Sequence, residues 1–266
     1  MSLSVAGRVA IVTGAGQGVG LAIARHLAEL RMRVVFADPN EAALSAVRDD
    51  YAGTDADIRI FAGRITEHLG MANLLSVTLD AFDRVDVLVN VQGDLRPSDP
   101  LDPDSGVLDD LLRQNVTAPL RLSQMVARRM IAQAHDGDAT GAIVTVLTRA
   151  AGPAMLAASI AGAAQEQAVR GLALSLAPHR IRVNGVRYAS VMSTRLQAHL
   201  REHPGLRDRI VAGTPLGRIA APDELADAVH YLASDGARFV TGQILTIDGG
   251  RGLGDPINEF PAPDGR

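Results

Sequence analysis

The sequence VAIVTGAGQGVG, residues 9–20, is the most informative stretch of this chain. Its first half is a run of Val, Ile and Ala that is typical of a buried strand, and four glycines then lead into a helical segment. In such a unit Gly14 permits the tight turn, Gly18 lets the backbone approach a pyrophosphate, and Gly20 allows close helix–strand packing. The unpaired N–H groups at the start of the helix favour a phosphate. The pattern predicts a dinucleotide-binding turn, and a tight turn without a ligand is the alternative.

The same alternation of strand and helix continues along the chain. Short apolar runs that predict buried strands lie at 9–14, 34–38, 86–90, 142–147, 181–186 and 244–248. Segments with a helical apolar period lie at 18–31, 40–51, 69–83, 107–133, 155–177 and 223–233. Buried strands separated by helices indicate a parallel sheet that is covered on both faces. We therefore expect an α/β fold, a single doubly wound domain over residues 1–250 with about seven parallel strands.

Three stretches fall outside this alternation. Residues 94–106 and about 188–222 are expected to be loop-rich insertions on the side of the sheet where ligands bind. The second of them would form a lid or substrate loop. The Gly- and Pro-rich residues 251–266 are expected to be a C-terminal tail.

Composition limits the partners and the chemistry. A net charge of −4 and a pI near 6.0 argue against nucleic acid or an anionic membrane as the main partner. The apolar N-terminal run is too short to span a membrane and no cleavage-type signal follows it, so we expect a cytoplasmic protein. The chain has no cysteine, and all 26 of its basic residues are arginine. Thiolate chemistry and lysine-dependent mechanisms are therefore excluded.

Asp38 ends the second predicted strand and bears on the choice of dinucleotide. A carboxylate at this point accepts hydrogen bonds from the adenosine ribose hydroxyls and repels a 2′-phosphate. Pro39 and Asn40 follow, with no arginine to attract that phosphate. The sequence therefore favours NAD over NADP. A role for Asp38 as a cap of the helix that begins near Asn40 is compatible with this interpretation.

Several motifs in the same order carry a family resemblance over roughly residues 5–250. They are TGAGQGVG at 13–20, QNVTAPL with Asn115, IRVN at 181–184, PLGRIAAPDEL at 215–225 and YLASDGARFVTGQILTIDGG at 231–250. With these motifs the chain resembles the short-chain dehydrogenase/reductase family. That resemblance implies a Rossmann domain, an NAD-dependent oxidoreductase of alcohol and carbonyl groups, and assembly into a homodimer or homotetramer.

The resemblance also implies where the reactive groups should lie. Family members use a tyrosine to exchange the hydroxyl proton, a lysine one helical turn later, a serine that orients the carbonyl, and an asparagine that supports a water relay. Aligned on AVRGLALSLAPHRIRVN, the tyrosine position falls on Gly162 and the lysine position on Glu166. The serine position falls on Thr148, and the asparagine is Asn115. No shift of register restores the missing pair, because the chain has no lysine and its tyrosines are Tyr51, Tyr188 and Tyr231.

The resemblance also implies cofactor-binding positions, and only some of them carry the residue type that the family uses there. They are Gly14, Gln17, Gly18, Val19, Gly20, Asp38, Arg64, Ile65, Asn90, Gly93 and Ser193. The family's NNAG is NVQG here, which puts Gln92 where an alanine lies beside the dinucleotide, and its PG is Tyr188-Ala189. Arg64 replaces an aspartate that accepts the adenine amino group, and a guanidinium offers no acceptor.

Two residues near the altered helix have alternative interpretations. Glu166 could accept hydrogen bonds from the nicotinamide ribose and favour NAD⁺ over NADH, or it could form a surface pair with Arg170 at i+4, which we favour. Tyr188 could replace the missing phenol with the help of the neighbouring Arg187 guanidinium. Alternatively, its ring fills the space left by Gly162, and we favour this second role.

The histidines show no metal-type spacing apart from His199 and His203, four residues apart. Because no carboxylate accompanies them in an HExxH arrangement, we expect solvated lid residues and no metal site.

Three functional hypotheses from different classes follow. The chain is a binding protein that holds NAD, or a related small-molecule ligand, without redox turnover. Alternatively, it is a repurposed enzyme that uses the pocket opened at Gly162 with Thr148 and Tyr188, or a non-catalytic subunit that assembles with an active relative. We favour an NAD-binding protein with impaired oxidoreductase chemistry.

Overall fold

The computed structural model describes residues 3–91, 95–134, 141–150 and 152–254. Within them the strands are β1 (Val9–Thr13), β2 (Arg33–Asp38), β3 (Ile58–Ala62), β4 (Val87–Val91), β5 (Gly141–Thr148), β6 (Ile181–Tyr188) and β7 (Ile244–Ile247). The α-helices are α1 (Gly18–Glu29), α2 (Glu41–Asp50), α3 (His68–Phe82), α4 (Val107–Leu111), α5 (Ala118–Ala132), α6 (Leu156–Leu176), α7 (Thr194–Glu202), α8 (Leu206–Ala212) and α9 (Pro222–Ala233). A π-helical segment, η1 (Leu112–Thr117), joins α4 to α5.

The strands form one seven-stranded sheet in the order β3-β2-β1-β4-β5-β6-β7, and every pairing is parallel. The order along the sheet reverses between β1 and β4. In a doubly wound sheet this reversal opens a crevice at the carboxyl ends of the strands, where ligands bind. The predicted α/β doubly wound fold is confirmed.

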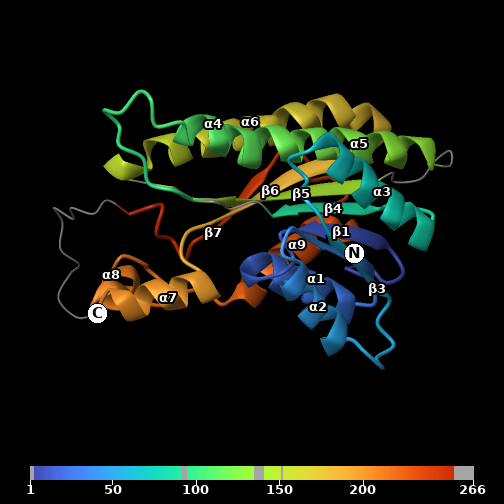
Figure 1. The fold of residues 1–266 in the computed structure, drawn as a ribbon, viewed down its shortest axis with the longest axis horizontal. Coiled ribbons are helices and arrows are strands. Elements are labelled where there is room, and N and C mark those ends of the chain that lie inside the picture. Colours follow the sequence, from blue (N-terminus) through green and yellow to red (C-terminus); the bar gives the residue numbers. More distant parts are fainter. Residues whose placement is uncertain (1–2, 92–94, 135–140, 151, 255–266) are drawn as a thin grey trace.

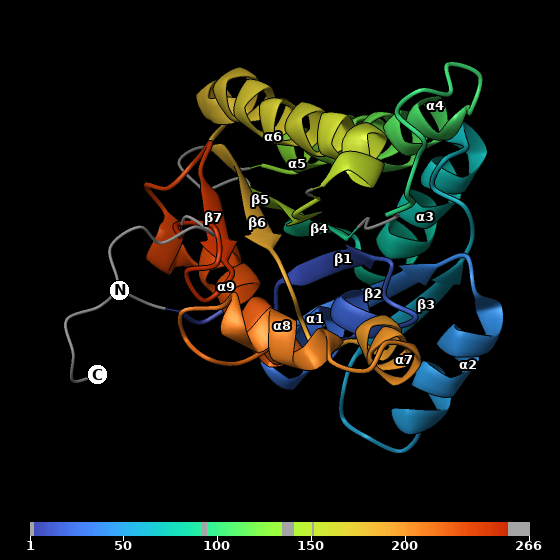
Figure 2. The ribbon, with the colours of Figure 1, turned by 90° about the vertical axis from the view of Figure 1, so that its left-hand side faces the viewer.

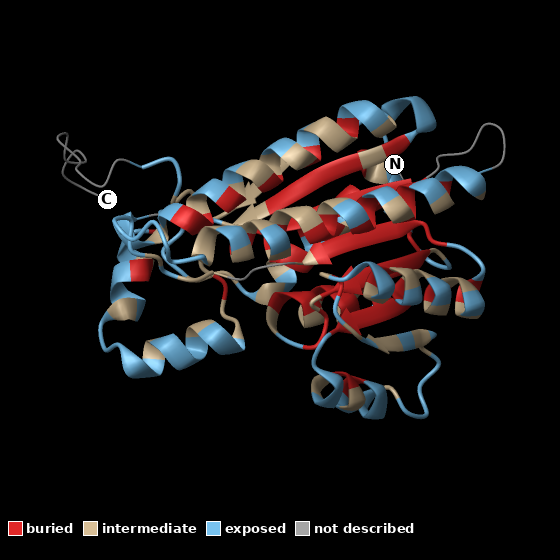
Figure 3. Cartoon of the chain, turned by 45° about the horizontal axis from the view of Figure 1, so that its top comes forward, coloured by how far each residue is buried: buried red, intermediate tan, exposed pale blue. Residues whose placement is uncertain are grey.

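Helices cover both faces of the sheet (Figures 1 and 2). The helices α1, α2 and α9 lie on one face, and α3, α5 and α6 lie on the other. The apolar residues of α1 recur every fourth position at Val19, Ile23 and Leu27, so they form one buried stripe on the sheet. The central strands are buried, whereas the helices alternate buried and exposed residues (Figure 3).

The strand β3 and the helices α7 and α8 were not predicted from the sequence. The edge strand β3 has the sequence IRIFA, and its residues are intermediate or exposed, so it lacks the continuous apolar character of the inner strands. The stretch 188–222, expected to be loop-rich, contains the helices α7 and α8. The predicted helix 107–133 is interrupted by η1. Most of the predicted tail, residues 255–266, lies outside the described residues.

Across the described residues, no helix combines the length and the apolar character that a membrane crossing requires.

Candidate functional site

The turn between β1 and α1 has the geometry of a close backbone cradle. Gly14 and Gly18 have φ of +61° and +57°, in the left-handed region that favours glycine. A Cβ at Gly20 would overlap the carbonyl oxygen of Gly14, so only glycine allows this approach of helix and strand. Gln17 stands at the N-cap in an extended conformation and its side chain makes no capping hydrogen bond. Val19 is buried in the first turn of α1. The first N–H groups of α1 are therefore directed to the crevice.

Asp38 lies at the carboxyl end of β2 and is only 8% exposed. Its carboxylate accepts hydrogen bonds from the backbone N–H of Gly16 (3.0 Å) and of Asn40 (2.8 Å). These bonds hold it beside the glycine turn. The helix α2 is capped by the side chain of Asn40, which accepts from the Ala43 N–H at 3.1 Å. Asp38 thus orients the capping residue and does not itself cap the helix.

A pocket of about 420 Å³ lies next to Asp38, beyond the end of β3. Its lining includes Pro39, Arg64, Ile65 and Gln114. Ile65 is buried, whereas Arg64 is exposed and has no hydrogen bond or ion pair with any other residue in the described ranges. The pocket therefore combines the apolar side chains of Pro39 and Ile65 with a guanidinium, that of Arg64, which has no partner among the described residues.

The end of β5 and the helix α6 meet at the other half of the crevice. No group of the described residues hydrogen-bonds the buried hydroxyl oxygen of Thr148, the last residue of β5. On α6, a Cβ added to Gly162 would have no described atom within 4 Å. Among the described residues, the structure therefore leaves the Thr148 hydroxyl without a partner and the Cβ position of Gly162 without a neighbour.

Glu166 is held by two arginines. Its carboxylate accepts from Arg187 of β6 at 2.7 Å and from Arg170, one helical turn along α6, at 3.3 Å. Arg187 also donates to the hydroxyl of Thr246 on β7 at 3.1 Å. The predicted pair with Arg170 is confirmed, but the shorter bond is to Arg187. The charge of Glu166 is therefore compensated within the protein.

Asn115 lies inside the π-helical segment η1 and is 6% exposed. Its backbone carbonyl accepts a hydrogen bond of 2.6 Å from the side-chain amide of Gln165. Sequence reasoning missed Gln165. A signal was present, because Gln165 falls on the buried stripe of α6 that includes Ala158, Ala161 and Val169, and a polar residue on an apolar stripe needs a partner.

Tyr188 ends β6 and pairs in register with Thr148. Its ring packs against the core formed beneath α1 and α9, whereas Arg187 reaches Glu166 on α6. Successive residues of a strand point to opposite faces, which explains the separation of Arg187 from Tyr188. The expectation that the Tyr188 ring fills the space at Gly162 is wrong, because no described atom lies within 4 Å of that position.

The remaining cofactor positions are distributed around the crevice. Asn90 is fully buried and donates to the hydroxyl of Ser123 at 2.9 Å, so it ties β4 to α5. Ser193 caps α7 by accepting from the Leu196 N–H at 3.3 Å. Its Cβ lies 3.9 Å from where a Cβ of Gly18 would stand, so the start of the lid touches the glycine turn. Gln92 and Gly93 lie outside the described residues.

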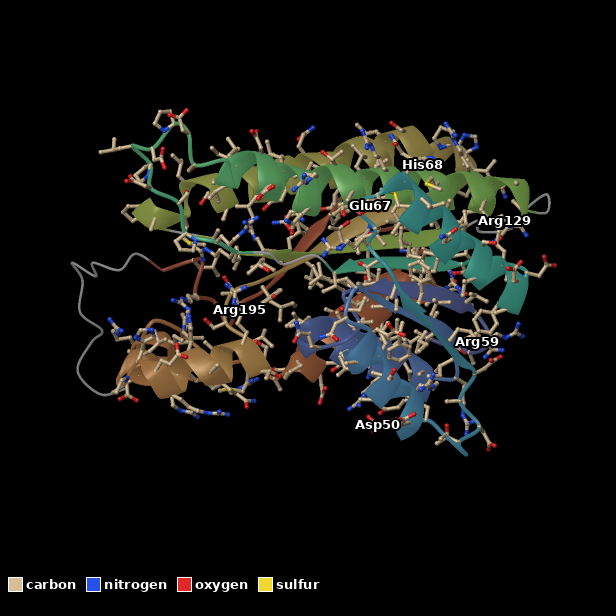
Figure 4. The ribbon with its side chains drawn as sticks, viewed as in Figure 1. Asp50, Arg59, Glu67, His68, Arg129 and Arg195 are labelled. Atoms are coloured by element: carbon tan, nitrogen blue, oxygen red, sulfur yellow. The ribbon has the colours of Figure 1, made fainter. Side chains whose placement is uncertain are left out.

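The lid is also tied to the loop after β4. Arg195 of α7 donates to the backbone carbonyl of Leu95 at 2.8 Å, and its side chain lies between the two segments (Figure 4). The helix α7 therefore contacts both the glycine turn and the opposite side of the crevice.

Comparisons with known proteins agree with this architecture. Residues 14–251 match a family model described as enoyl-(acyl carrier protein) reductase. The 7α-hydroxysteroid dehydrogenase of Escherichia coli K12 is 30% identical over 252 residues, which cover 94% of this chain and 96% of that enzyme. The chain belongs to the short-chain dehydrogenase/reductase family.

One further relative and one solved structure are similar over nearly the whole chain. The cis-4-hydroxycyclohexanecarboxylate dehydrogenase of Sinomonas cyclohexanicum is 36% identical, with 94% of this chain and 98% of the relative covered. A solved structure of 7α-hydroxysteroid dehydrogenase, complexed with NADH and 7-oxo glycochenodeoxycholic acid, has a TM-score of 0.85 at 29% identity. The match covers 93% of this chain and 95% of that one.

Proposed function

We propose that this chain binds an NAD-type dinucleotide and that its hydride-transfer chemistry is impaired or absent. The observation that carries this proposal is the composition of α6. The helix contains neither tyrosine nor lysine, and the carboxylate at its lysine position, Glu166, is held by Arg187 and Arg170.

The residues of the phosphate and adenosine half fit a dinucleotide. The glycine turn, with Gly14 and Gly18 in the left-handed conformation and the N-terminus of α1 beside it, suits a pyrophosphate. The Asp38 carboxylate would accept from ribose hydroxyls and would repel a 2′-phosphate, which supports NAD over NADP. The pocket lined by Pro39 and Ile65 would take the base.

The residues of the reactive half do not fit an acid–base mechanism. A nicotinamide, when bound, supplies or accepts a hydride, and the protein must then exchange a proton with the substrate oxygen. Thr148 can donate a hydrogen bond to a carbonyl, but an aliphatic hydroxyl is too weak an acid to release its proton. The amide of Gln165 bonds the Asn115 carbonyl, where it cannot relay protons. Loss of general acid–base catalysis costs about 10²–10⁴ in rate.

Binding is tested by titrating the chain into NADH and following the nicotinamide fluorescence, which is free of tryptophan emission because the chain has none. We expect saturable enhancement with NADH, and weaker enhancement with NADPH. Gly18→Asp should abolish it, since a carboxylate beside the turn repels phosphate and aspartate tolerates the left-handed conformation. Gly171→Asp is the control, because a Cβ there meets no described atom within 4 Å.

Turnover is then followed at 340 nm with an alcohol panel taken from the relatives, namely a 7α-hydroxysteroid and cis-4-hydroxycyclohexanecarboxylate. Binding without turnover supports the proposal. Steady turnover that Tyr188→Phe or Thr148→Val abolishes would favour a repurposed enzyme. No binding, together with co-purification of a relative that carries the tyrosine and lysine, would favour a non-catalytic subunit. We expect a homodimer or homotetramer in size-exclusion chromatography.

A further inference from the structure

The C-terminal end of the lid helix α7 gathers three possible metal ligands. The sequence there is HLREH, residues 199–203. One ligand atom from each of His199, Glu202 and His203 lies within 4.8 Å of the other two. The two imidazole rings have their centroids 5.5 Å apart and stand at 90° to one another.

The backbone accounts for this cluster. Side chains three and four residues apart lie on the same face of a helix, which brings Glu202 and His203 over His199. His203 is the C-cap of α7, with φ −125° and ψ 85°, and its N–H still donates to the His199 carbonyl at 3.0 Å. The turn that ends the helix therefore keeps the second imidazole beside the first.

The three side chains are available to a ligand. All are exposed, and within the described ranges none forms a side-chain hydrogen bond or ion pair. The other close histidine pair differs in this respect. Although its rings are 5.7 Å apart, His230 is bonded to the Leu3 carbonyl at 2.6 Å and His26 faces Asp227 at 3.5 Å.

We propose that His199, Glu202 and His203 form a Zn²⁺ site. Two imidazole nitrogens and one carboxylate oxygen are a ligand set that zinc takes, with water in the fourth position. Tetrahedral bonds of about 2.1 Å need ligand atoms about 3.4 Å apart, which small rotations of exposed side chains provide. Nitrogen ligands disfavour Ca²⁺ and Mg²⁺. The negative end of the α7 dipole adds attraction for a cation.

This proposal departs from the expectation, drawn from the sequence, that His199 and His203 are solvated lid residues without a carboxylate partner in an HExxH arrangement. Glu202 supplies a carboxylate from between the two histidines. A bound ion would fasten the end of α7 to the turn before α8. Since the N-cap of α7, Ser193, lies beside the glycine turn, the ion would stabilise this helix whether or not a dinucleotide binds.

The test is a competition between untagged protein and a chromogenic chelator for Zn²⁺ alone, at pH 7.5. We expect one tight equivalent of Zn²⁺ per chain. His199→Ala, His203→Ala and Glu202→Gln should each weaken binding by about tenfold or more. The control is His68→Ala, which removes a solitary exposed histidine at the start of α3, remote from α7 (Figure 4), and should change nothing.

The pH dependence gives a second readout. Because imidazole must be neutral to bind a metal, Zn²⁺ affinity should fall as the pH is lowered. Circular dichroism melting would confirm that the variants are folded, as expected for substitutions of exposed residues. The proposal is overturned if the parent chain does not compete with the chelator, or if the His199 and His203 variants bind Zn²⁺ as tightly as the parent.

Discussion

Introducing a tyrosine at Gly162 and a lysine at Glu166 should restore hydride transfer only if Arg187 is also replaced. The present 2.7 Å ion pair between Glu166 and Arg187 would become a contact between two cations. At about 4 Å and an effective dielectric constant of about 20, like charges repel by about 4 kcal/mol.

Solvent reduces this repulsion, because the side chains of Arg187 and Glu166 are 37% and 20% exposed. We therefore expect the variant Gly162→Tyr/Glu166→Lys to lose about 1–3 kcal/mol of unfolding free energy. In a chain of this size each kcal/mol lowers the melting temperature by about 2–4 °C. Adding Arg187→Ala should recover most of the loss, because the cation that remains near the lysine, Arg170, is 48% exposed and can turn into solvent.

The triple variant should also gain activity. No described atom lies within 4 Å of the Gly162 Cβ position, so a tyrosine can start from the helix there. We expect NADH formation at 340 nm, with the same alcohol panel, to rise by about 10²–10⁴ over the parent chain. The matched control carries Gly162→Phe in place of Gly162→Tyr. Equal turnover in the two triple variants would refute the reasoning, as would a double variant that melts at the temperature of the parent.

Three further perturbations test other parts of the molecule. Hydrogen bonds from the Arg218 side chain and from the Ala221 N–H lower the pKa of Glu224 to about 2. The ionised Glu224 therefore stabilises the folded chain at pH values above its unfolded-state pKa of about 4.3. This stabilisation is lost as the pH falls to 2. The difference in unfolding free energy between the parent and Glu224→Gln should therefore shrink across this window in urea titrations, and a constant difference would contradict it. Asp38→Asn removes the charge that repels a 2′-phosphate. It should raise the affinity for NADPH relative to that for NADH by about tenfold, or 1.4 kcal/mol. An unchanged ratio of the two affinities in fluorescence titrations would count against Asp38 as the residue that excludes the 2′-phosphate. Arg64→Asp gives the pocket lined by Pro39 and Ile65 an acceptor for the adenine amino group. It should tighten NADH binding by about fivefold, the effect of one hydrogen bond of about 1 kcal/mol. Weaker binding would show that Arg64 itself holds the ligand.

The parts of the fold predictable from the sequence are those in which one segment carries its own pattern. The turn at 13–20 and the buried strands can be predicted from the local sequence, because their residue types suit only a few backbone conformations. The edge strand β3 does not, since its exposed positions interrupt the apolar run and its strand state depends on pairing with β2. The short helices α7 and α8 bury a single residue, Ile210, and neither helix was predicted.

The contacts of the site also fall into two groups, local contacts that the sequence predicts and tertiary contacts that it does not. The pair of Glu166 with Arg170 follows from helical spacing and was predicted. The shorter bond to Arg187 depends on how α6 packs on β6, which no local pattern encodes. The bond from Gln165 to the Asn115 carbonyl likewise requires η1 and α6 to lie side by side. The sequence therefore predicts which groups α6 lacks, while tertiary packing determines how the groups that it has are held.

The most direct measurement is the transfer of deuterium from 4-deuterated NADH, at a saturating concentration, to the ketones of the alcohol panel, followed by mass spectrometry over one day. A helix without a proton donor should leave the labelled product about 10²–10⁴-fold below that of the triple variant Gly162→Tyr/Glu166→Lys/Arg187→Ala under the same conditions. Many labelled molecules per chain, lost in Tyr188→Phe or Thr148→Val, would show that another group on this protein completes the reaction.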